Sequence, residues 1–125
     1  MSFGLFVIYL GRFLLGGAFV VFGLRNLKNI PRLTEAMEKK GLLPQPRYWM
    51  ILGVGIQIVG GAMVALNFLP WLGALALIAF LLLAAYLFHA FWEFPKDEQS
   101  PHINAWIMNT ALSGAFLTIA ASAFF

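Results

Sequence analysis

The feature that most constrains the fold is a long uncharged stretch: residues 48–92 contain no Lys, Arg, Asp or Glu. A helix that crosses a bilayer needs about 20 apolar residues, so this stretch is too long for one span and long enough for two. Asn67 and Pro70, in the central "NFLPW" segment, favour a break there because proline does not continue a helix. We therefore expect a hairpin of two membrane spans, residues 48–67 and 70–91.

Two further apolar runs, residues 3–24 and 103–124, are each long enough for one more span. With 62% hydrophobic and 10% charged residues, the 125-residue chain is far more apolar than a soluble domain of this length. The first run lacks the basic start and the small-residue cleavage site of a signal peptide, so we expect it to be retained. The predicted fold is all-α: an integral membrane four-helix bundle forming one transmembrane domain over residues 1–125.

The basic residues predict how the bundle is oriented. Lys and Arg residues concentrate in the loops on the cytoplasmic side of a membrane protein. Seven of the eight lie between spans one and two or between spans three and four: Arg25, Lys28, Arg32, Lys39, Lys40, Arg47 and Lys96. We therefore expect a multi-pass protein of a bacterial cytoplasmic (inner) membrane, with both termini outside the cytoplasm.

The first loop predicts a short amphipathic helix at the membrane interface. Its "PRLTEAMEKKG" segment begins with Pro31, places Glu35 four residues before Lys39 and ends at Gly41, a typical helix terminator. Three apolar residues fall on one helical face: Ile30, Leu33 and Met37. Such a helix is either a surface connector or a docking surface for a soluble partner or anionic lipid.

Arg12 is the one charge within the first span, where a charge costs roughly 2.5 to 3.5 kcal/mol on insertion scales. It shares a helical face with Gly16 and Gly23, which allow a second helix to approach closely. We expect the guanidinium to point inward and to donate hydrogen bonds to Gln57 or Asn109.

The other spans also place polar residues on single faces. Tyr86, His89 and Glu93 align at the end of the third span, where a protonated His89 could pair with Glu93. Together the spans predict one polar seam that binds a ligand through six residues: Arg12, Gln57, Tyr86, His89, Trp92 and Asn109. The alternative is that these residues only form hydrogen bonds between helices.

Several kinds of chemistry are disfavoured. The chain has no cysteine, so it supplies no disulfide, thiolate nucleophile or cysteine metal ligand. His89 and His102, even with Glu93, match no closed set of metal ligands, and we predict no metal site. The net charge of +3 is explained by loop residues beside apolar runs, so we expect no nucleic-acid partner.

Four blocks of the sequence resemble the DoxX family of small four-span bacterial membrane proteins: "GRFLLGGAFVVFGLRNL", "GLLPQPRYWMILGVGIQIVGGAMVALNFLPWLGAL", "HAFWEFP" and "MNTALSGAFL". The resemblance covers nearly the whole chain and keeps the order of the blocks. Two positions depart from the family pattern, because many relatives carry a glutamate in place of Gln57 and a lysine in place of Met108.

The resemblance implies an accessory or quinone-interacting subunit of a membrane redox system rather than a self-sufficient enzyme. Relatives include a component of a thiosulfate:quinone oxidoreductase and proteins that assemble with superoxide dismutase and sulfurtransferase. The expected partners are therefore the lipid bilayer, a redox protein and further copies of the chain, and the expected ligand is a quinone or another lipid-like molecule. Two other functions stay open: a membrane scaffold or assembly factor that anchors a soluble partner, and a carrier of a small apolar metabolite.

Overall fold

The computed structural model describes residues 2–124, and its regular elements are all helices. Four long helices are apolar enough to cross a membrane, which confirms the predicted all-α four-helix bundle. They are α1 (Phe3–Leu27), α3 (Pro46–Ala65), α4 (Pro70–Phe88) and α5 (Ser100–Ala121). The short helix α2 (Ile30–Lys40) follows α1, and three 3₁₀ turns complete the order: η1 (Phe91–Glu93), η2 (Lys96–Glu98) and η3 (Ser122–Phe124).

The ends of the helices follow from local chemistry. The Ser2 hydroxyl caps α1 by accepting a hydrogen bond of 3.1 Å from the backbone N–H of Leu5. Proline stands in the first turn of the other four α-helices, where a missing N–H costs nothing. Gly41 ends α2 in the left-handed conformation, at φ 67°, as its position in the sequence predicts.

Helices α1 and α3 are antiparallel and pack through glycines. A Cβ at Gly61 would lie 2.6 Å from the backbone oxygen of Gly16, and one at Gly16 would collide with the Gly61 oxygen in turn. Further along, Gly23 lies against Gln57 and Ile58 of α3. The face predicted for close helix contact is therefore the face that α3 covers.

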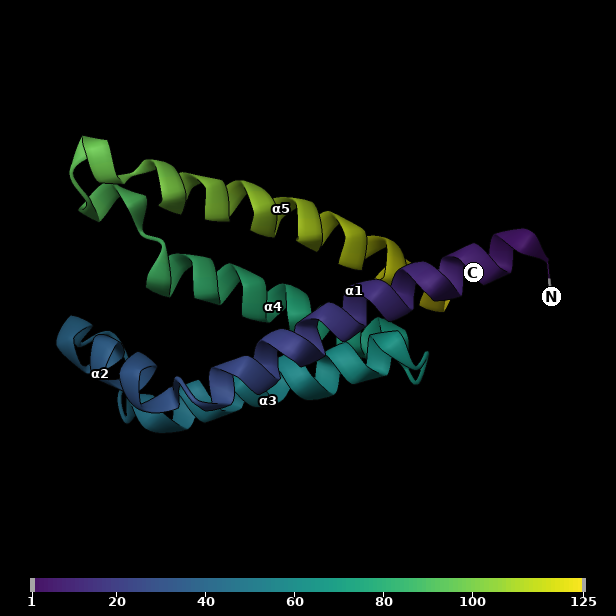
Figure 1. Ribbon diagram of the computed structural model, residues 1–125, viewed down its shortest axis with the longest axis horizontal. Helices are drawn as coiled ribbons and strands as arrows, with labels where there is room; N and C mark the ends of the chain where they lie inside the picture. The colour runs from purple at the N-terminus through teal and green to yellow at the C-terminus, as the bar shows by residue number, and fades with distance from the viewer. Residues whose placement is uncertain (1, 125) are drawn as a thin grey trace.

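On its neighbouring face α3 packs against α4, again through small residues. A Cβ at Gly73 of α4 would lie 2.8 Å from the backbone oxygen of Gly60. Helix α5 in turn lies along α4 (Figure 1). The rings of Phe19 and Phe116 meet edge to face, with their centroids 5.3 Å apart, and bring α5 against α1. This contact lies in the buried core, which Val64, Leu77 and Leu81 extend.

Helix α2 lies at the end of the bundle opposite the chain termini (Figure 1). Its Met37 is buried, with 1% of its surface exposed, while Ile30 and Leu33 are half-buried. The side chains of Glu35 and Lys39 approach to 3.6 Å, as their spacing predicts. The Lys40 ammonium donates a hydrogen bond to the backbone oxygen of Leu87, which ties α2 to the end of α4.

Candidate functional site

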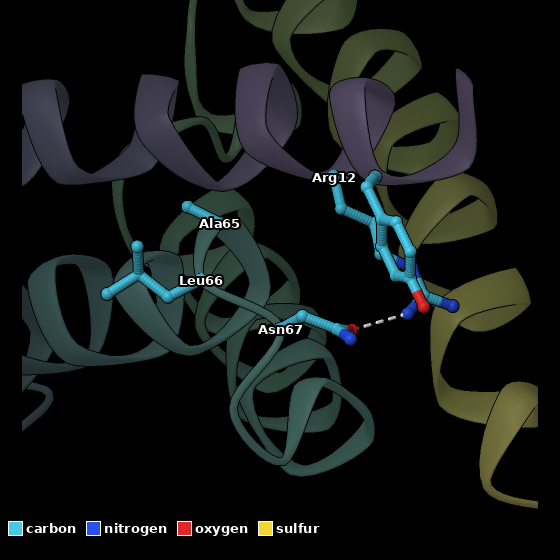
Figure 2. Close-up of a pocket in the computed structure, with 5 residues that line it drawn as sticks. Arg12, Ala65, Leu66 and Asn67 are labelled. Atoms are coloured by element: carbon cyan, nitrogen blue, oxygen red, sulfur yellow. Dashed lines mark hydrogen bonds between the residues drawn. The ribbon is translucent and has the colours of Figure 1, made fainter. Parts of the chain in front are cut away.

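Arg12 and the α3–α4 turn form a polar site at one end of the bundle. One Nη atom of Arg12 donates a hydrogen bond of 2.7 Å to Oδ1 of Asn67 (Figure 2). Asn67 stands in the turn between α3 and α4 at φ 57°, a left-handed conformation that asparagine tolerates better than most residues. The turn therefore directs the side-chain amide of Asn67 toward α1.

The sequence predicts Gln57 or Asn109 as the hydrogen-bond partner of Arg12, and this prediction is wrong. The glycine contacts place Gln57 level with Gly23, and Gly23 lies about 16 Å along α1 from Arg12. Arg12 precedes Gly16 by one turn and so lies level with the residues just beyond the end of α3. The helical face of a residue does not show how far along the neighbouring helix the residue lies, which explains why the predicted partners of Arg12 are wrong.

A pocket of about 270 Å³ opens beside the guanidinium. Its lining is Tyr9, Arg12, Ala65, Leu66 and Asn67. Arg12 is half-buried there, and among residues 2–124 its guanidinium donates only the bond to Asn67. A guanidinium carries five N–H donors, so several of them remain available to an oxygen atom in the pocket.

Gln57 lies inside the α1–α3 interface instead. Its side chain is 5% exposed, and its Oε1 accepts a hydrogen bond of 3.1 Å from Nδ2 of Asn26. Asn109 plays a similar part between α5 and α4, where its Nδ2 donates to the backbone oxygen of Leu81 at 3.0 Å. Both side chains join helices, as the alternative to a ligand role anticipates.

The end of α4 carries a second polar cluster. The Nδ1 atoms of His89 and His102 are 3.0 Å apart, which requires one Nδ1 to carry a proton and donate a hydrogen bond to the other. The indole N–H of Trp106 donates to the backbone oxygen of His89 at 2.7 Å, and the ring of Phe94 stacks on His102 at 4.0 Å. The rings are thus fixed by contacts from several elements.

Tyr86 and Trp92 flank this histidine pair on the surface. Their ring centroids are 6.2 Å apart, and both side chains are about half exposed. The predicted alignment of His89 and Glu93 on one helical face is wrong, because α4 ends at Phe88 and Glu93 belongs to η1. Within the described residues no ion pair joins His89 to Glu93, whose side chain is exposed.

The six candidate residues therefore do not form one pocket. Tyr86, His89 and Trp92 come together at one end of α4, whereas Arg12 lies near the other end. Helix α4 has 19 residues, so about 28 Å separates the two sites. Within residues 2–124 no three His, Cys, Asp or Glu side chains are placed to share a metal ion.

Sequence reasoning missed Asn67 and Asn26 as partners of Arg12 and Gln57. The signal was present in the small residues. Aligning Gly16 with Gly61 in antiparallel order sets Arg12 level with Ala65, beside the turn, and the contact of Gly23 with Gln57 brings Gln57 within one helical turn of Asn26.

A model of the DoxX family matches residues 7–90. The chain belongs to the DoxX family. The matched segment runs from α1 to the residue before η1 and contains Arg12, Asn67 and His89, while Trp92 and Asn109 lie beyond it. No curated protein and no solved structure matches the chain. Family and structure together describe a multi-pass integral membrane protein that contacts the lipid bilayer.

Proposed function

We propose that this DoxX-family protein binds a quinone, or another lipid-like molecule with a carbonyl oxygen, in the Arg12 pocket. The observation that carries the proposal is a half-buried guanidinium in an apolar span with one donor engaged and a pocket of about 270 Å³ beside it. A charged donor in an apolar setting strongly favours an oxygen acceptor.

The surroundings suit a ring with a hydrocarbon tail. Ala65, Leu66 and the Tyr9 ring provide apolar surface around the guanidinium, and Tyr9 is 39% exposed. A head group can enter this pocket while its tail remains among the lipid chains, so the ligand need not leave the membrane. A quinone in this pocket would fit a redox subunit that works with a partner protein.

Substitution of Arg12 tests the proposal. Hydrogen bonds to charged groups contribute about 1.5–3 kcal/mol, so Arg12→Gln should weaken binding of a short-chain quinone analogue by roughly 10- to 100-fold. Arg12→Lys keeps the charge but loses the planar fork, so it should fold and bind poorly, whereas Arg12→Leu should abolish binding. The measurement is a binding titration of the protein in lipid nanodiscs.

Arg25→Gln is the matched control, because Arg25 is an exposed arginine in the last turn of the same helix. It should leave the affinity unchanged. If Arg12→Gln lowers thermal stability but binds the analogue as the wild type does, Arg12 only secures the α3–α4 turn and the proposal is wrong.

The basic loops support an orientation with α2 and η2 in the cytoplasm of a bacterial cell and both termini outside. The chain has no cysteine, which makes single-cysteine labelling direct. With a membrane-impermeant maleimide, Phe68→Cys in the α3–α4 turn should react in intact cells. Glu98→Cys should react only after permeabilisation, and the reverse pattern would contradict the orientation.

A further inference from the structure

A second, larger cavity lies at the opposite end of α1 from Arg12. This groove of about 700 Å³ lies where the end of α1, the helix α2 and the start of α3 meet. Leu27, Ile30 and Ile51 provide its apolar part. Leu27 ends α1 and Ile51 lies near the start of α3, so these side chains lie where the spans emerge from the lipid.

The rest of the groove is polar and of mixed charge. Glu35 and Glu38 of α2 and Arg47 of α3 line it, together with Thr34. Among the residues described, the Thr34 hydroxyl oxygen is buried without a hydrogen-bond partner, and neither Glu38 nor Arg47 has an ion-pair partner. Glu35 pairs with Lys39 at 3.6 Å, but both side chains are well exposed and such a pair contributes little.

This charge pattern differs from that of the surrounding loop. The loop as a whole is basic and would attract anionic lipid. The groove itself, however, is lined by two carboxylates and one guanidinium, with the Lys39 ammonium 3.6 Å from Glu35, so an anionic head group would meet both signs of charge there. A zwitterionic head group instead supplies an ammonium for the carboxylates and a phosphate for the arginine.

We propose that the groove binds an aminophospholipid of the phosphatidylethanolamine type. The primary ammonium donates to Glu35 and Glu38, and the phosphate accepts from Arg47 and the Thr34 hydroxyl. The acyl chains run along Leu27, Ile30 and Ile51 into the bilayer. A primary ammonium carries three N–H donors and a choline group carries none, so the two carboxylates select ethanolamine over choline.

Native mass spectrometry of the detergent-purified protein tests this proposal. The probes are phosphatidylethanolamine, phosphatidylcholine and phosphatidylglycerol with identical acyl chains. The wild type should bind phosphatidylethanolamine about fivefold more tightly than phosphatidylcholine, as expected for charge-assisted hydrogen bonds at a partly exposed site. Equal affinities, or a preference for phosphatidylglycerol, would overturn the proposal.

Variants then locate the site. The double variant Glu35→Gln, Glu38→Gln should bind phosphatidylethanolamine and phosphatidylcholine alike, while Arg47→Gln should weaken both lipids by a similar factor. Lys96→Gln and Glu98→Gln, in the exposed η2 turn outside the groove, should keep the wild-type preference. Preference that survives in the glutamate double variant, or that is lost equally in the η2 controls, contradicts a site in the groove.

Discussion

At the scale of residues, Arg12 shows how a membrane span can contain a charge. It lies level with a turn rather than at the middle of the bundle, and the Asn67 amide accepts one of its hydrogen bonds. Both features reduce the cost of insertion, since charges near span ends and charges with partners are tolerated best. The remaining donors border a pocket, which is why we propose that the ligand binds at this arginine.

The histidine pair belongs to the same scale but not to the same site. His89→Ala should remove the bond to His102 and lower the free energy of unfolding by about 1 kcal/mol. Because about 28 Å separates His89 from the Arg12 pocket, affinity for the quinone analogue should not change. Thermal unfolding and the nanodisc titration on the same variant check both halves, and a tenfold loss of affinity would place the ligand at the histidines instead.

At the scale of elements, helix packing depends on glycines on two faces of α3. Gly61 allows the backbone of α1 to approach closely, and Gly60 does the same for α4. Within a bilayer, apolar side chains gain nothing by exchanging contact with lipid for contact with another helix. Close backbone approach and van der Waals contact therefore hold such helices together. The polar bonds of Gln57 and Asn109 add to this packing.

Gly61→Ala should therefore separate α1 from α3. The added methyl would lie 2.6 Å from the Gly16 oxygen, and overpacking of this kind costs about 1–3 kcal/mol. Gly55→Ala is the matched control in the same helix, because its Cβ would meet nothing within 4 Å. Thermal unfolding in detergent should show a clear loss for the first variant and none for the second. Equal stabilities would mean that the glycine contact is not needed.

At the scale of the whole molecule, two polar sites lie at opposite ends of an apolar bundle. Hydropathy predicts the four spans, and Pro31 and Gly41 predict the limits of α2, because these signals are local. The face of Arg12, Gly16 and Gly23 also follows from helical spacing. Helical spacing does not give the depth of Arg12 in the membrane. That depth depends on which residues of α1 and α3 lie side by side, and the contact between Gly16 and Gly61 sets this register. The predicted seam therefore divides into the Arg12 pocket, two interhelical bonds and the histidine cluster.

The separation of the two ends makes photo-cross-linking the most direct test of the central claim. A quinone analogue with an azide on its head group, irradiated with the protein in nanodiscs, labels the residues around the bound ring. We expect peptides that contain Tyr9, Arg12 or residues 65–67 to carry the label, and an excess of unmodified quinone to suppress it. Label confined to residues 86–106, or unaffected by the competitor, would contradict a quinone site at Arg12.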